Sequence, residues 1–279
     1  MTETPSQPAQ HHPREAVVTV VYGTHAERLD YTFSSFAQNP HLELHAFVLA
    51  DRLPRNQVPG IRYHLRAPDP AFSHPMRDAD YRRWVFLDEL EADYALVVDG
   101  LDVLCLQPLP RIPDLLRGYW LGACVEHAGN RMLRGHLYTA NFLNAGVTFW
   151  DVRKSISLRK EIVQIGRRRF RNLQDDQITL NELVHTRYFE NLIILPCQYN
   201  YRALLKRRYP GWPTVSSLDS VKIYHSYLGI ENAKRHQPFL PYIQLPELQA
   251  DKKHISALLR WLRRINERIG LSYLLFRKD

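Results

Sequence analysis

The stretch that decides the fold is Tyr94-Ala-Leu-Val-Val-Asp-Gly-Leu-Asp102. Its first five residues are nearly all apolar, which is typical of a strand buried on both faces of a parallel sheet. The strand runs directly into Asp99, and Gly100 permits a tight turn before Asp102. Because open α/β sheets bind ligands at the carboxyl ends of their strands, the two carboxylates indicate a site there.

Upstream of this stretch, apolar strands alternate with helical patterns. The order is β-α-β-β-α-β, which predicts a mainly parallel sheet covered by helices on both faces. We expect strands at 16–22, 44–49 and 61–65 and helices at 25–39 and 78–90.

Downstream, the pattern is mixed. We expect strands at 120–125, 145–150, 192–195 and 221–224 and helices at 157–169 and 177–184. Neither a G-x-G-x-x-G nor a Walker A pattern occurs in the sequence. Their absence argues against a Rossmann dehydrogenase and against a P-loop protein.

Composition favours one globular α/β domain. The chain has 279 residues, of which 45% are hydrophobic and 24% charged. Residues 1–15 read as a disordered tail without the apolar core of a secretory signal, residues 16–245 as the domain and residues 246–279 as a separate helical segment. The three cysteines suit neither a disulfide framework nor a zinc site, so we expect a cytoplasmic protein.

The formal charge of +8 points to an anionic partner, which charge alone does not identify. The basic run 167–171 reads as one face of a surface helix rather than as a nucleic-acid surface, so no nucleic-acid partner is expected. No stretch reaches the roughly 18 apolar residues that a membrane span needs.

The paired carboxylates Asp99 and Asp102 suit Mn²⁺ or Mg²⁺, which prefer oxygen ligands and are often shared with substrate phosphates. The alternative is a solvated turn that happens to contain two aspartates. His225 follows a short apolar strand and is either a third metal ligand or a hydrogen-bonded structural histidine.

Two further segments carry polar groups next to expected elements. Asn144-Ala-Gly146 lies before a strand, where amides beside a glycine allow a ligand to approach closely; the alternative is a turn. Asp176-Gln177 opens a helix, where an aspartate is also a common cap.

Together, these four segments resemble, in order and interval, glycosyltransferase family 8. This is a family of retaining GT-A enzymes that includes bacterial lipooligosaccharide galactosyltransferases and glycogenin. The resemblance runs from about Val17 to His236. It implies an α/β, Rossmann-like GT-A fold with a mainly parallel central sheet flanked by helices. The basic amphipathic helical segment 246–279 lies beyond the resemblance.

The resemblance also implies roles for individual residues. Asp99, Asp102 and His225 are the expected metal ligands. Asp176 and Gln177 are the expected catalytic residues, lying against the transferred sugar. The residues expected to bind the nucleotide sugar are Tyr22, Gly23, Thr24, either Arg82 or Arg83, Asn144, Gly146, Gly229 and Lys234.

The sequence departs from the family in three places. The metal motif is Asp-x-x-Asp, as in collagen-modifying glycosyltransferase domains, where the family has Asp-x-Asp. Ile178 replaces a second aspartate. Gly229 follows His225 by four residues instead of three, and the basic residue for the diphosphate moves to about Lys234.

The expected activity is therefore metal-dependent transfer of a hexose from a nucleotide-diphosphate sugar, such as a UDP-sugar, to a glycan or lipid-linked acceptor, with retention. A nucleotidyltransferase is the alternative enzyme, but segment 21–26 lacks its Lys- or Arg-rich phosphate loop. A catalytically inactive GT-A protein and a nucleic-acid-binding protein are further alternatives.

The final segment has an apolar stripe and many basic residues. Its stripe is Ile255, Leu258, Leu259, Leu262, Ile265 and Ile269. Such a helix either packs on the domain or lies on an anionic membrane, which would make the protein peripheral to the inner face of the membrane.

Overall fold

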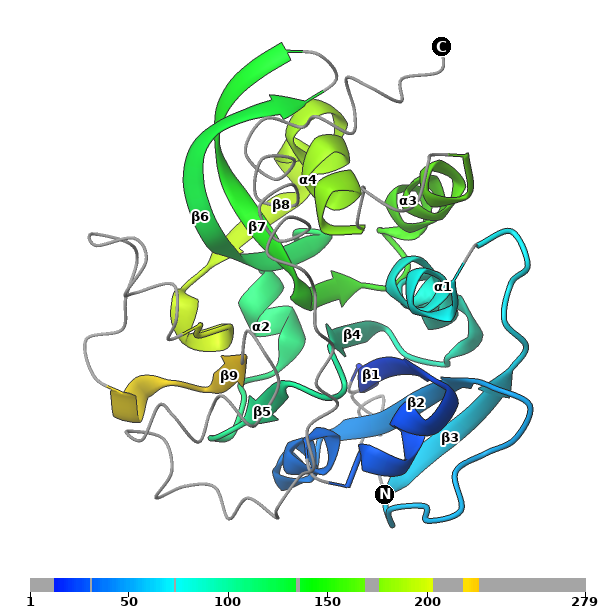
Figure 1. Ribbon diagram of the computed structural model, residues 1–279. Coiled ribbons are helices and arrows are strands. Elements are labelled where there is room, and N and C mark those ends of the chain that lie inside the picture. The colour runs from blue at the N-terminus through cyan, green and yellow to red at the C-terminus, as the bar shows by residue number, and fades with distance from the viewer. Residues whose placement is uncertain are drawn as a thin grey trace, which may run out of the picture.

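The computed structural model describes residues 13–30, 32–72, 74–133, 136–168, 176–202 and 218–225. Its centre is a seven-stranded sheet in the order β3-β2-β1-β4-β7-β6-β8, accompanied by a two-stranded sheet of β5 and β9 (Figure 1). The expected mainly parallel sheet with flanking helices is confirmed.

The parallel part of the sheet is built from the expected apolar runs. β1 (Glu15–Tyr22) pairs in parallel with β2 (Leu42–Leu49) and β4 (Tyr94–Val98), and β2 pairs in parallel with β3 (Ile61–Arg66). Four of the five residues of β4 are buried, as its apolar sequence predicts.

β7 (His136–Asp151) joins the two halves of the sheet, because it is antiparallel to both β4 and β6 (Leu121–Leu133). β8 (Leu192–Leu195) then pairs in parallel with β6. The strands expected at 120–125 and 145–150 are thus confirmed but much longer, forming a hairpin that rises beyond the sheet (Figure 1).

Helices cover both faces. One core packs against α1 (Pro75–Arg82), α3 (Ile156–Arg168) and α4 (Asp176–Arg187), and the other against α2 (Ile112–Leu116) and the small sheet of β5 (Val103–Cys105) and β9 (Ile223–His225). The remaining helical turns are the 3-10 segments Gly23–Arg28, Phe33–Gln38, Val85–Glu89, Phe189–Asn191, Cys197–Tyr199 and Leu218–Ser220.

Two predicted helices were wrong in form. The helix expected at 25–39 is two 3-10 segments, and the hydroxyls of Ser34 and Ser35 donate to the carbonyls of Asp30 and Thr32. Such local side-chain bonds compete with a regular helix. The helix expected at 78–90 ends as α1 at Arg82 and resumes only as a 3-10 segment at Val85.

No described helix combines the length and the apolar content that crossing a membrane requires.

Candidate functional site

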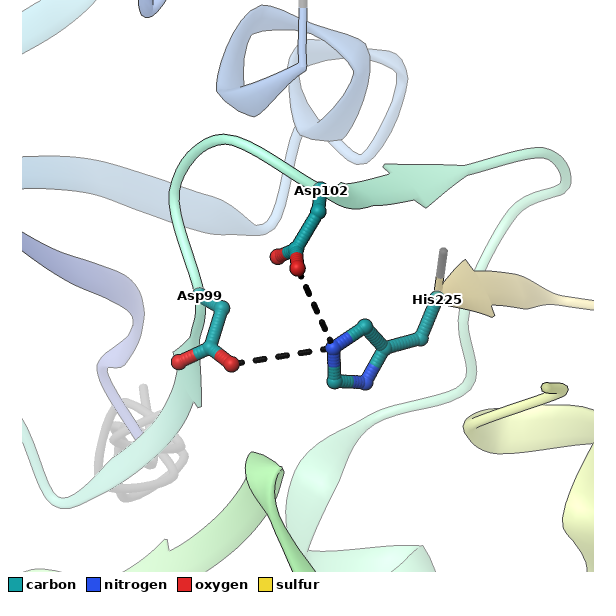
Figure 2. Close-up of side chains that lie close together, drawn as sticks. All are labelled: Asp99, Asp102 and His225. Carbon is teal, nitrogen blue, oxygen red and sulfur yellow. Dashed lines mark ion pairs between the residues drawn. The ribbon is translucent and has the colours of Figure 1, made fainter. Parts of the chain in front are cut away.

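Three side chains meet where β4 ends and where β9 ends (Figure 2). The Nε2 atom of His225 lies 3.6 Å from Oδ2 of Asp99 and 3.7 Å from Oδ2 of Asp102. One ligand atom from each residue lies within 4.8 Å of the others, and no other group of this kind occurs in the described part of the chain. The predicted metal ligands are therefore together in space.

Hydrogen bonds fix which nitrogen of His225 faces the carboxylates. Asn200 donates from Nδ2 to Oδ1 of Asn144 at 2.8 Å, so its own Oδ1 is an acceptor. That oxygen lies 3.0 Å from Nδ1 of His225 and accepts its N–H. Nε2 is thereby turned towards the two carboxylates, and an imidazole held in this way is a common metal ligand.

Two glycines let the backbone approach this group closely. A Cβ atom on Gly146 would lie 2.4 Å from Oδ2 of Asp99 and 2.4 Å from Cε1 of His225. A Cβ atom on Gly100 would lie 2.5 Å from Oγ1 of Thr19. The glycine between the two aspartates thus serves close packing against β1.

Arg83 connects the carboxylates on two different elements. Its guanidinium donates from Nη1 to Asp99 and from Nη2 to Asp176, the first residue of α4. Arg82 faces elsewhere: it pairs with Asp78 and donates to the carbonyl of Ala67 at 2.8 Å. Of the two arginines that the sequence left open, only Arg83 joins the cluster.

Neighbouring charges keep Asp99 and Arg83 ionised. Burial raises the pKa of the Asp99 carboxyl, but the charges of Arg83, His225 and Arg202 outweigh it and leave the pKa below its usual value. Burial lowers the pKa of Arg83, and the neighbouring carboxylates, led by Asp176, more than reverse this. Arg83 therefore stays a buried cation next to the predicted metal ligands.

A network of amides extends the site towards α4. The Oε1 atom of Gln177 accepts from the amide of Ala145 at 3.0 Å and from Nδ2 of Asn144 at 3.2 Å. The Nε2 atom of Gln177 donates to Glu126, which is also paired with Arg202.

Glu126 and Arg202 are not among the predicted site residues. Neither belongs to a recognisable motif, and only the pairing of β6 with β7 brings Glu126 beside Asn144. Asp80 on α1 was not predicted either; burial, and after it the charge of Asp176, raises the pKa of its carboxyl to about 8.

Tyr22, Gly23 and Thr24 lie at the carboxyl end of β1, the same edge of the sheet. The Tyr22 ring lies 4.4 Å from the ring of His25 and 6.0 Å from that of His74, measured between centroids. Gly23 has a left-handed backbone with φ of 53°. His74 immediately precedes α1, so the ring lies on the α1 side of the site. Burial, and after it the charge of Asp80, raises the pKa of the Tyr22 hydroxyl.

Gly229, Lys234 and the segment 246–279 lie outside the described residues. A hollow of about 290 Å³ lies at the opposite edge of the sheet, at the amino ends of β1, β2 and β3, and includes Glu43, His45 and His64 in its lining. It contains none of the predicted site residues.

The donor set fits a divalent cation. Two carboxylates and one imidazole nitrogen are ligands that Mn²⁺ accepts, and a single imidazole beside oxygen ligands does not favour a structural zinc site. Because Gly146 has no Cβ atom, the side chains of Asp99 and His225 can occupy the space that such an atom would fill.

No protein-family model matches the sequence, and the search of curated proteins found no match. Solved structures do match. The galactosyltransferase LgtC, in complex with donor and acceptor sugar analogs, shares 16% identity over 83% of this chain and 97% of its own, with a TM-score of 0.51. The chain has the GT-A fold.

Two further structures agree with this fold. The glycosyltransferase GlyE of Streptococcus pneumoniae TIGR4 shares 15% identity over 96% of this chain and 65% of its own, with a TM-score of 0.55. Mouse xyloside xylosyltransferase 1 shares 12% identity over 76% of this chain and 98% of its own, with a TM-score of 0.50.

Proposed function

We propose that this protein is a metal-dependent glycosyltransferase that moves a hexose from a nucleotide-diphosphate sugar, such as a UDP-sugar, to a glycan or lipid-linked acceptor. One observation carries the proposal: Asp99, Asp102 and His225 converge at the carboxyl edge of a GT-A sheet, and Arg83 links them to Asp176. The similar solved structures are glycosyltransferases, which supports the same chemistry.

Asp99, Asp102 and His225 would hold the divalent ion. When bound, Mn²⁺ supplies positive charge to the diphosphate oxygens, whose negative charge grows as the sugar–phosphate bond breaks. Tyr22, Gly23 and Thr24 would receive the nucleotide base, since they lie at the same edge of the sheet on β1 and the turn after it.

Asp176, Gln177, Asn144 and Gly146 would face the transferred sugar. As the bond between the anomeric carbon and the phosphate oxygen breaks, a bond from the acceptor hydroxyl oxygen forms on the same face. The hydroxyl proton passes to the departing phosphate oxygen, so a separate base is not required. The carboxylate of Asp176 would stabilise positive charge at the anomeric carbon.

The test of function has two steps. A panel of nucleotide sugars is first screened by thermal unfolding with Mn²⁺ present, because a ligand that binds only the folded state stabilises it by about 2.7 kcal/mol at 100 times its Kd. The donor found is then assayed for hydrolysis and transfer. We expect both to stop in excess EDTA and in Asp102→Ala, with the unfolding temperature of the variant nearly unchanged.

Full activity in EDTA would overturn the metal dependence, and stabilisation by no nucleotide sugar would overturn the donor class. Retention is tested separately by NMR of the product from an α-linked donor. An α-linked product is expected, and a β-linked product would refute retention.

A further inference from the structure

Glu126 occupies the centre of the polar layer that holds Gln177. Its Oε2 atom accepts from Nε2 of Gln177 and from Nδ2 of Asn144, the latter at 3.3 Å. Its Oε1 atom forms an ion pair with Nη1 of Arg202 at 3.1 Å. The side chains of Glu126 and Arg202 are only 11% and 10% exposed, so this is a largely buried ion pair.

These contacts determine the orientation of the Gln177 amide. Nε2 faces a carboxylate, which accepts only, and Oε1 faces the backbone N–H of Ala145 and the Nδ2 of Asn144, which donate only. Rotating the amide by 180° would place acceptor against acceptor and donor against donor. A charged acceptor makes the stronger bond, so Glu126 contributes most to holding this orientation.

We infer that Glu126, held in place by its ion pair with Arg202, is a positioning residue that fixes the orientation of the Gln177 amide. The Gln177 oxygen consequently acts through its oriented dipole and not as a nucleophile. The inference rests on the proposed sugar transfer. The oxygen already accepts two hydrogen bonds from the protein, which lowers its tendency to attack carbon. The locked amide instead presents one fixed face to the donor sugar.

The amide network and the ion pair share Glu126. One of its carboxylate oxygens meets the amides of Gln177 and Asn144, and the other meets Arg202. We expect a variant at Glu126 to affect donor orientation more than donor affinity, because Glu126 bonds to the amides of Gln177 and Asn144.

An exchange of the two side chains tests the inference. In Glu126→Gln, either Gln177 or Arg202 faces an amide donor; in Gln177→Glu, two carboxylates face each other. In the double variant, the amide at 126 can donate to the carboxylate at 177 while its oxygen still accepts from Arg202, and the charge of the pair is unchanged. Only the 3.3 Å bond from Nδ2 of Asn144 is lost.

We expect Glu126→Gln to lower kcat about 10- to 100-fold, the effect of a misplaced site group, with a smaller change in KM. The double variant should exceed each single variant in kcat by about tenfold, as for directly coupled residues. Glu161→Gln, which removes the charge of another Arg-paired glutamate, is the matched control and should leave kcat unchanged. A double variant no better than the poorer single variant would overturn the inference.

Failure of the proposed function would be recognised separately, as absence of transfer by the wild type with every donor. The ¹⁵N NMR signal of the Gln177 side-chain amide then decides the inference without turnover. We expect slow proton exchange in the wild type and fast exchange in Glu126→Gln. Equal exchange rates in the two proteins would show that Glu126 does not fix the Gln177 amide.

Discussion

Any other residue at Gly146 would displace side chains of the predicted metal site. Its missing side chain leaves room for Asp99 and His225, both of which a Cβ atom would approach to 2.4 Å. Gly146→Ala should therefore displace both predicted ligands and weaken Mn²⁺ binding at least as much as Asp102→Ala.

The Gly146→Ala experiment is titration calorimetry with Mn²⁺, accompanied by thermal unfolding. We expect the affinity for Mn²⁺ to fall by more than tenfold, in line with changes to groups that orient metal ligands, which cost about 10- to 100-fold. Unchanged affinity in a folded variant would show that the three residues do not bind the ion together.

His45 makes the stability of the fold depend on pH. Burial, aided by the charge of His64, lowers the pKa of His45 from 6.5 to about 4. The unfolded chain therefore takes up a proton more readily than the folded chain, and stability falls as the pH drops from about 6.5 towards 4. His64 and Arg62 oppose the protonation of His45, while Glu43 favours it.

For a single group with this shift, the free energy of unfolding should fall by about 2 kcal/mol between pH 7 and pH 5. His45→Phe removes the titrating group, so its urea unfolding should lose correspondingly less over the same range, even though the variant starts less stable. Parallel pH profiles for the two proteins would contradict this explanation.

At the scale of elements, Arg159 joins α3 to the segment that follows α1. Its guanidinium donates to the carbonyls of Trp84 and Val152, each at 2.6 Å, and pairs with Asp88 at 2.7 Å. The side chain is 0% exposed. Since Arg83 directly follows α1 and precedes Trp84, this contact also supports the site.

Arg159→Met should cost about 3 kcal/mol of stability, because it leaves two buried carbonyls and a carboxylate without their donor. Chemical unfolding measures the loss. Arg153→Met is the matched control: Arg153 also pairs with an aspartate, Asp93, but its side chain is 84% exposed, so a change within about 0.5 kcal/mol is expected. Similar losses in the two variants would refute the special role of Arg159.

At the scale of the whole molecule, the basic segment 246–279 gives the chain a second expected partner. If it lies on an anionic membrane, each basic residue near the surface adds about 1 kcal/mol to binding. Deleting the residues after Lys252 should release the protein from anionic liposomes in a sedimentation assay while transfer to a soluble acceptor persists. Unchanged liposome binding, or a truncated protein that does not fold, would favour a helix packed on the domain.

Some features of the fold and the site could be predicted from the sequence because neighbouring residues determine them. The run from Tyr94 to Val98 is apolar throughout, and β4 has those bounds. Asp99 and Asp102 were identifiable because they follow that strand directly. His225 was identifiable because it ends a short apolar run, and β9 ends at the same residue.

Other features depend on contacts between distant segments. The helix expected at 25–39 has the right apolar spacing, but two 3-10 segments form there, and Thr32 between them donates its hydroxyl to the distant carbonyl of Gly100. The sequence also left Arg82 and Arg83 as equal candidates, because adjacent residues on one helix differ only in the direction that they face.

The sequence by itself determined the parallel sheet, the edge where the site lies and most of the residues there, because periodicity and strand ends are properties of neighbouring residues. Only the tertiary structure decided that Arg83 bridges Asp99 to Asp176, that Asn200 orients His225 and that Glu126 holds Gln177. The physical reason is that each of these contacts joins side chains at least 16 residues apart in the chain, whose meeting depends on how strands and helices pack and leaves no pattern in the local sequence.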